Sequence, residues 1–270
     1  MEIQWSLVSF TALAGAGAWL FFCVGVDAFV QRTNKAAFPA SLLAVVLLAL
    51  GGLCSVTHLS HPDRMLGALA HPAPGIFLEA LLLGLLAVVA IVFAVLVKRQ
   101  AGAGVRKALA LVGMVLALAF TFSCGSSYLM ASQAAWNTPT LPLAYLGTAA
   151  ASGTAVWAVL TAVLKEDVAA VRLSGWEVLV GGAAALVLSA AYGFVSGMAV
   201  GEQALLFWAA VAVCGGALPM VCGWVMAKHP DKGLAYAVVA LVGALVGSVA
   251  LRALMWLVGS ALMSLFGVSI

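Results

Sequence analysis

The sequence predicts an all-α, polytopic membrane protein with eight transmembrane helices, and three observations lead to that prediction. The 270 residues are 65% hydrophobic and only 8% charged, a balance that suits a bilayer rather than water as the main solvent. Apolar runs long enough to cross a hydrocarbon core of about 30 Å recur along the whole chain. These runs are continuous rather than alternating, which favours helices over a β-barrel.

The apolar runs account for most of the chain, so we expect a single integral-membrane domain over residues 1–270, arranged as two four-helix bundles. Gly and Ala are abundant within the runs, and small residues let membrane helices approach closely. The expected spans lie at approximately 7–29, 38–58, 75–97, 108–131, 142–164, 178–200, 204–227 and 234–258.

Basic residues predict the orientation. Of the 12 Lys and Arg residues, all but Arg64 and Arg252 fall in or beside the connectors that follow the first, third, fifth and seventh spans. The positive-inside rule places those connectors in the cytoplasm. Both termini are then expected outside, together with the connectors 59–74, 132–141 and 201–203.

This topology brings separate polar side chains to the outer half of the membrane. His58 ends the second span, Glu79 lies about one turn into the third, and Tyr128 is expected in the last turns of the fourth. Arg252 is expected about two-thirds of the way along the eighth span. Groups of this kind cost several kcal/mol, roughly, to bury without a partner, so their placement needs an explanation.

Each of these residues has a structural and a functional interpretation. Glu79 is either an interfacial carboxylate favoured by the helix dipole or a proton acceptor. His58 is either a satisfied interfacial histidine or a base that holds a ligand hydroxyl and takes its proton. Arg252 either snorkels to the outer interface, or forms an ion pair with a carboxylate such as Glu79, or contacts a ligand or partner.

The outer connectors contain candidates for a docking surface. Trp136 and Asn137 form a stiff Trp-Asn-Thr-Pro loop, which is either a turn with an interfacial anchor or a surface for a partner protein. Arg64 is a further candidate for partner docking.

The sequence predicts no metal, haem or cluster bound by this chain. Its five cysteines are scattered through apolar runs without any C-x-x-C pair, and they are read as small core residues. No histidine lies deep in a predicted span, so two axial haem ligands cannot face one another across the bundle.

Several segments resemble the membrane-anchor subunits of dimethyl sulfoxide reductase-type complexes, the DmsC-like family. The opening Trp5–Thr11 resembles the family's W-x-L…F-T start, and His58–Arg64 resembles its H-L-G-x-P-x-R segment, with Glu79 about twenty residues further on. The stretch Ser126–Leu146 looks like the family's S-x-x-Y…W-N-T-P…P-L-x-F-L region, and Arg252–Trp256 resembles its R-x-x-x-aromatic run. One departure is Ser248, which stands where some members carry Glu four residues before the arginine.

The resemblance implies a subunit of the bacterial cytoplasmic (inner) membrane that binds and oxidises menaquinol. Its electrons would pass to an iron–sulfur subunit docked on the outer face, which feeds a molybdopterin catalytic subunit. The family's quinol-binding histidine and glutamate correspond to His58 and Glu79. Tyr128 and Arg252, which the topology brings to the same depth, are second choices for contacting the headgroup or for holding Glu79. The chain would then host the quinol-oxidation half-reaction but not the chemistry of the terminal substrate.

Two other function classes remain open at this stage. A small-molecule transporter is expected to have broken helices and polar sites near mid-membrane, and Pro219 is the one interior proline that suggests such a break. A structural membrane anchor without any ligand would need neither. Co-purification with an iron–sulfur protein distinguishes the electron-transfer anchor from a transporter. Reduction of that iron–sulfur protein by quinol distinguishes it from a ligand-free anchor.

Overall fold

Helices make up every regular element in residues 2–33, 35–57 and 74–265, which are the residues that the computed structural model describes. Within these residues eight helical segments are long and apolar enough to cross a membrane, which confirms the predicted all-α, eight-span fold. The elements follow in chain order as α1 (Trp5–Val30), α2 (Ala37–Val56), α3 (Pro74–Lys98), α4 (Ala103–Ser126), α5 (Thr140–Val163), α6 (Val168–Val195), α7 (Ala204–Leu206), the π-helix η2 (Phe207–Ala217), α8 (Leu218–Lys228), the 3-10 helix η3 (Pro230–Lys232) and α9 (Gly233–Leu265).

The seventh span is assembled from α7, η2 and α8 and stays continuous from Ala204 to Lys228. Pro219 stands at the start of α8. Proline has no backbone N–H, and its ring clashes with the carbonyl four residues earlier, so an α-helix cannot run through it undisturbed. The wider π-helical turns lie directly before Pro219, where they accommodate the ring without breaking the span.

Two helix ends differ from the sequence expectation in ways that matter for the site. The fourth span ends at Ser126 rather than near 131, so Tyr128 lies in the following connector. The sixth span begins at Val168 rather than near 178, because the Asp167 side chain caps it by accepting a hydrogen bond from the backbone N–H of Ala170 at 2.7 Å. This earlier start places Glu177 inside the span.

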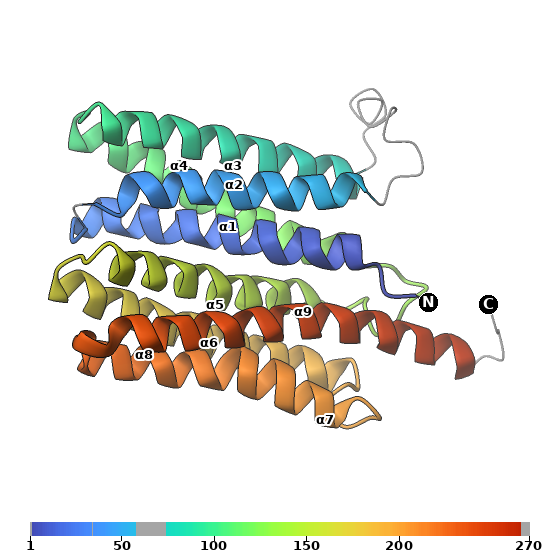
Figure 1. Cartoon of the computed structure of the whole chain (residues 1–270). Helices are drawn as coiled ribbons and strands as arrows, with labels where there is room; N and C mark the ends of the chain where they lie inside the picture. The colour runs from blue at the N-terminus through green and yellow to red at the C-terminus, as the bar shows by residue number, and fades with distance from the viewer. Residues whose placement is uncertain (1, 34, 58–73, 266–270) are drawn as a thin grey trace.

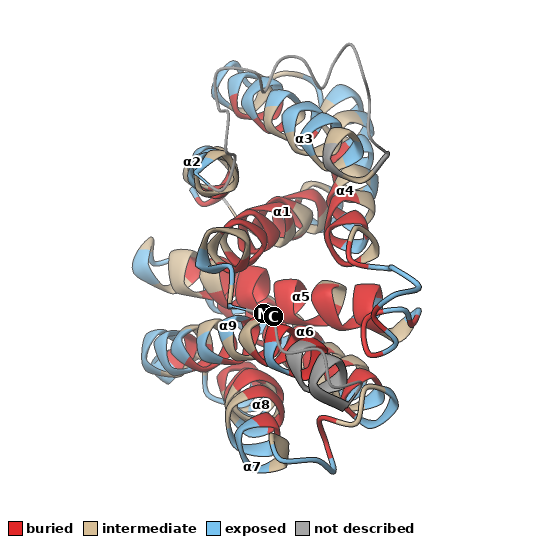
Figure 2. Cartoon of the chain, turned by 90° about the vertical axis from the view of Figure 1, so that its right-hand side faces the viewer, coloured by how far each residue is buried: buried red, intermediate tan, exposed pale blue. Residues whose placement is uncertain are grey.

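The first and fifth spans form the centre of the molecule. α1 packs against α2, α4 and α5, while α5 packs against α1, α4, α6 and α9. Figure 2 shows α1 and α5 as the most buried helices, with more exposed helices around them. The two halves of the chain, α1–α4 and α5–α9, lie on either side of this α1–α5 contact (Figure 1), so they share one continuous interior. Their division into two separate four-helix bundles stays a prediction.

Some neighbouring helices meet at glycine. In the contact between η2 and α9, a side chain on Gly247 would collide with the Cα atom of Gly215. In the contact between α6 and α8, a side chain on Gly223 would collide with the backbone nitrogen of Leu179. Packing in these places is therefore backbone against backbone, as the abundance of small residues predicts.

The basic connectors gather at one end of the molecule, which we call the cation-rich end. Figure 1 shows it on the left, with the described chain termini toward the opposite end on the right. Its connectors are 31–36, 99–102, 164–167 and the turn around 229–232.

Two buried carboxylates hold the cation-rich end together. Glu166 Oε1 accepts hydrogen bonds from the backbone N–H groups of Lys35 and Ala36 at 2.6 and 2.7 Å, which places a negative charge at the start of α2. Asp27 accepts from the backbone N–H groups of Arg32 and Thr33 at 3.1 and 3.0 Å. These bonds tie the connector after α1 both to its own helix and to the connector after α5.

Candidate functional site

An aromatic cluster lies at the end opposite the cation-rich end. The Tyr128 ring has its centroid 6.0 Å from Trp136, 5.7 Å from Tyr145 and 6.1 Å from Trp256. The Trp136 indole N–H donates a hydrogen bond to the backbone carbonyl of Met255 at 2.8 Å. The connector that follows α4 is thereby fixed against α5 and α9.

The docking residues predicted in this connector have different environments. The Trp136 side chain is only 2% exposed and packs against Gly259, where an added Cβ would lie 2.8 Å from the indole ring. It therefore fastens the connector to α9, because its donor group and its ring are both used inside the chain, and its role in docking a partner stays a prediction. Asn137 is exposed and remains available at the surface.

Arg252 in α9 is 1% exposed, and its guanidinium is held by polar groups from three helices. Nε donates to the hydroxyl of Thr11 in α1 at 2.7 Å. Nη1 donates to the hydroxyls of Thr148 in α5 at 3.2 Å and of Ser248 at 2.7 Å. The guanidinium carbon also lies 4.4 Å from the centroid of the Tyr145 ring, a cation–π contact.

This environment bears on two of the interpretations that the sequence left open for Arg252, while its contact with a ligand or partner stays a prediction. The side chain does not snorkel to an interface, because it is buried among α1, α5 and α9. Its hydrogen bonds within the described chain go to hydroxyl and carbonyl oxygens, and Glu79 is not among them. Ser248 supplies two neutral oxygens to the guanidinium, its hydroxyl and its backbone carbonyl.

Glu79 lies about one and a half turns into α3 and is half-buried. Its carboxylate is within hydrogen-bonding reach of the Ser127 hydroxyl, which follows the end of α4. Gly75, one turn earlier, also faces Ser127, since an added Cβ there would lie 3.4 Å from the hydroxyl oxygen. The start of α3 thus packs on the end of α4 and directs Glu79 toward the connector that contains Tyr128.

Three side chains from different elements lie close enough to interact electrostatically: Glu79, Tyr128 and Arg252. The charges of Glu79 and Arg252 both act on Cys124 and on Tyr128. Burial raises the pKa of the Tyr128 phenol well above its usual value, and neighbouring Tyr145 and Glu79 raise it further. Tyr128 therefore keeps its proton at neutral pH, and its hydroxyl lies within hydrogen-bonding reach of that of Tyr145.

Two predicted site residues, His58 and Arg64, lie outside the described residues. The ends of the neighbouring helices are described: α2 ends at Val56, and α3 begins at Pro74. The contact between His58 and Glu79 stays a prediction.

Sequence reasoning missed Glu177. Its carboxylate is within hydrogen-bonding reach of Trp157 in α5, while its Oε2 atom is buried and has no hydrogen-bond partner among the described residues. The missed signal was the N-capping residue Asp167, followed directly by an apolar run. Starting the span there would have placed Glu177 about two and a half turns inside it.

Metal ligands do not cluster in the part of the chain that the structure describes. No group of three or more His, Cys, Asp or Glu side chains there is placed to hold an ion, and the five cysteines are unbonded.

Comparison with protein families adds an independent line of evidence. The family model described as DMSO reductase anchor subunit (DmsC) matches residues 1–256, nearly the whole chain. A comparison with curated proteins gives no match. The family match and the eight spans agree with the resemblance seen in the local motifs. The chain therefore belongs to the DMSO reductase anchor subunit family, DmsC, and is a multi-pass membrane anchor of a DMSO reductase-like complex.

Proposed function

We propose that this chain oxidises menaquinol in the bacterial cytoplasmic membrane. The quinol headgroup binds at the end that carries the described termini. We expect this end to lie outside the cytoplasm, because the cations gather at the other end. The electrons pass to an iron–sulfur subunit docked on that face, and from there to a molybdopterin catalytic subunit. This assignment extends the anchor role of the family to a specific chemical step.

One observation supports the proposal best. Glu79 in α3 and Arg252 in α9 both act electrostatically on Cys124 and on Tyr128, which lies in the connector after α4. Oxidation of a quinol to the quinone releases two electrons and two protons. A base must therefore stand within hydrogen-bonding reach of a quinol hydroxyl. Glu79 is the carboxylate among these side chains, and His58 is the second proton acceptor.

Tyr128 and Arg252 have supporting roles in this proposal. Tyr128 stays protonated, so it donates a hydrogen bond and takes no proton from the quinol. Arg252 is occupied by hydrogen bonds to Thr11, Thr148 and Ser248, and its positive charge acts on Tyr128 from inside the bundle. The Arg252 charge stabilises the negative charge that develops on a bound headgroup, and it does so without direct contact with that headgroup.

The electron acceptor has to be a partner, because the sequence offers no ligand set for a redox centre in this chain. Its docking surface is proposed at the same end, on the connector after α4. Leu129, Met130, Ser132 and Asn137 are exposed on that connector, whereas Trp136 is buried beneath it. Arg64 is proposed to extend this surface.

The test is quinol-dependent turnover of the assembled complex carrying Glu79→Gln or His58→Ala. We expect a loss of roughly 100-fold or more, the usual scale of general-base catalysis. Turnover with an artificial dye that reduces the partner directly should stay unchanged. Glu202→Gln is the matched control, because Glu202 is an exposed carboxylate at the same end, in the connector between α6 and α7.

Normal quinol turnover by both variants in fully assembled complexes would refute the site. In that case the residues are structural, and a ligand-free anchor becomes the better explanation. Loss of dye-driven turnover as well would mean that the variants disturb the docking of the partner rather than the quinol.

A further inference from the structure

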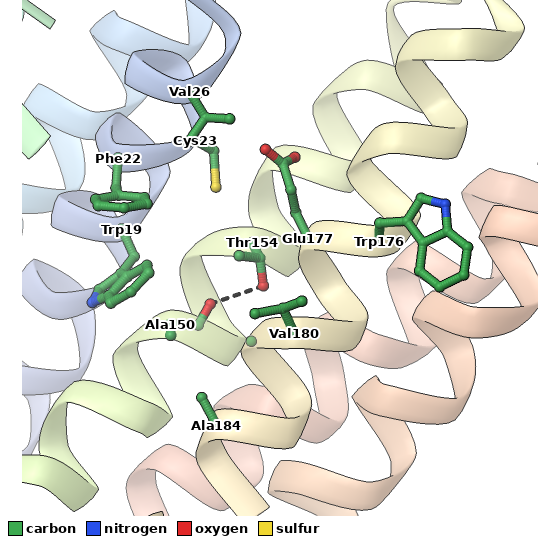
Figure 3. Close-up of a pocket in the computed structure, with 11 residues that line it drawn as sticks. Trp19, Phe22, Cys23, Val26, Ala150, Thr154, Trp176, Glu177, Val180 and Ala184 are labelled. Atoms are coloured by element: carbon green, nitrogen blue, oxygen red, sulfur yellow. Dashed lines mark hydrogen bonds between the residues drawn. The ribbon is translucent and has the colours of Figure 1, made fainter. Parts of the chain in front are cut away.

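A cavity of about 240 Å³ lies between α1, α5 and α6. Figure 3 shows Trp19 and Phe22 on its α1 side, Ala150 on its α5 side and Ala184 on α6. On α6 the lining runs from Trp176 to Ala184, which is about 12 Å along the helix axis. A cavity of this volume and length is longer than it is wide, and its long direction follows the spans, as lipid chains do.

The lining is apolar, because its polar groups are used elsewhere. The Thr154 hydroxyl donates to the backbone carbonyl of Ala150 at 2.8 Å, as Figure 3 shows. The Glu177 carboxylate is within hydrogen-bonding reach of Trp157, and its Oε2 atom is buried away from the cavity surface. A ligand in the cavity therefore touches an almost entirely apolar surface. Water needs two to four polar partners, so it does not fill such a cavity.

The cavity opens sideways, onto the surface of a membrane-spanning helix. Val180 and Trp176 line it and are 63% and 41% exposed. Both belong to the sixth span, so their exposed surfaces face the hydrocarbon of the bilayer. An empty cavity leaves the atoms of its lining without contact partners, and a hydrocarbon chain that enters from the bilayer restores those dispersion contacts.

The cavity begins close to the cation-rich end. Val26 is part of its lining and lies four residues before the end of α1, about 6 Å along the axis. The connectors after α1 and after α5 meet at this end, where Glu166 accepts a hydrogen bond from the backbone N–H of Lys35. Among the described residues of these connectors, the exposed charged side chains are Arg32, Lys35, Lys165 and Asp167. Three cations against one carboxylate favour a phosphate group at this level.

We propose that this cavity is a binding site for one acyl chain of a phospholipid, whose phosphate lies beside Arg32 and Lys165. The lipid belongs to the leaflet at the cation-rich end, and its chain runs between α1 and α6 toward the middle of the membrane. The cavity adjoins the α1–α5 contact, where the two halves of the chain meet. The bound chain therefore completes the packing at that contact. This site does not depend on the quinol chemistry proposed above.

The test is photolabelling of the assembled complex in native membranes. The probe is phosphatidylglycerol with a diazirine in the middle of one acyl chain, and labelled peptides are mapped at increasing mole fractions of the probe. We expect labelling of the peptides that contain Phe22–Val26 and Val180–Ala184 to reach saturation. Val88 and Val95 on α3 are exposed to bulk lipid, so labelling of their peptide should rise in proportion to the probe.

Two variants address the chain and the headgroup separately. Ala184→Phe fills the cavity and should abolish the saturable labelling. Val187→Phe is its control, because Val187 is exposed on α6 one turn away and does not line the cavity. Lys165→Gln should raise the mole fraction for half-maximal labelling roughly 5-fold, the effect of one basic side chain near anionic lipid.

Labelling of the α1 and α6 peptides in proportion to the α3 peptide would overturn the site, because only bulk lipid would then touch them. Equal saturable labelling in Ala184→Phe and Val187→Phe would also overturn it. If Ala184→Phe does not assemble, saturation in the unmodified complex and its shift in Lys165→Gln decide the question. Displacement of the probe by added quinol but not by unlabelled phosphatidylglycerol would count against the phospholipid, since the occupant would then be the tail of a quinol.

Discussion

At the residue scale, Arg252 shows how this protein buries a charge without a carboxylate. A buried cation is usually expected to have an acidic partner, because its transfer from water is costly. Here hydroxyl and carbonyl oxygens of Thr11, Thr148 and Ser248 take that place, and the Tyr145 ring covers the guanidinium. Because these groups belong to α1, α5 and α9, the arginine also joins helices that are far apart in the sequence.

Replacing Arg252 by lysine should therefore destabilise the protein although the charge is kept. A lysine ammonium cannot reproduce the planar fork that reaches oxygens on three helices at once. We expect a loss of about 1–3 kcal/mol, the scale of one hydrogen bond to a charged group, measured as a lower midpoint of thermal unfolding in detergent. Arg172→Lys on the exposed face of α6 is the control. Equal midpoints of thermal unfolding for Arg252→Lys and Arg172→Lys would contradict the role given to the guanidinium of Arg252.

The same residues show what the sequence could and could not predict. Glu79 and Arg252 stand out because each interrupts an apolar run, so their importance follows from the cost of burial alone. The partners of Arg252 could not be predicted, because Thr11 and Thr148 lie 241 and 104 residues away. Helices that are apolar all round carry no amphipathic stripe to say which face meets which neighbour.

At the element scale, glycine contacts decide how closely the helices pack. The contact between η2 and α9 brings Gly215 and Gly247 together at backbone distance. Without a hydrophobic driving force between helices in lipid, this close packing is a main source of their association. The expected span 204–227 agrees well with the structure, but the π-helix inside it was not foreseen, since no local residue pattern specifies it apart from Pro219.

Adding one methyl group at this contact should be enough to disturb it. In Gly247→Ala the new Cβ meets the Cα atom of Gly215, and backbone cannot move aside as a flexible side chain can. We expect a destabilisation of about 1–3 kcal/mol, as for other overpacked sites. Gly84→Ala is the matched control, since nothing lies within 4 Å of an added Cβ there and alanine favours a helix by about 1 kcal/mol. A neutral Gly247→Ala would show that the two helices separate without cost.

At the scale of the whole molecule, the chain has two unlike ends joined by a buried centre. The cation-rich end is fastened by Asp27 and Glu166, while the opposite end contains the aromatic cluster, Glu79 and the exposed Asn137. α1 and α5 connect the two ends through the middle of the molecule. The two ends therefore present different surfaces on the two sides of the membrane.

The orientation itself is the last prediction. The positive-inside rule places the cation-rich end in the cytoplasm, so Glu202→Cys should react with a membrane-impermeant maleimide added to intact cells. Asp231→Cys, in the turn before α9, should react only after the membrane is opened. The unmodified chain gives the background, because its five cysteines all lie within membrane-spanning helices. The opposite labelling pattern would reverse the orientation, and the partner would then dock on the cytoplasmic face.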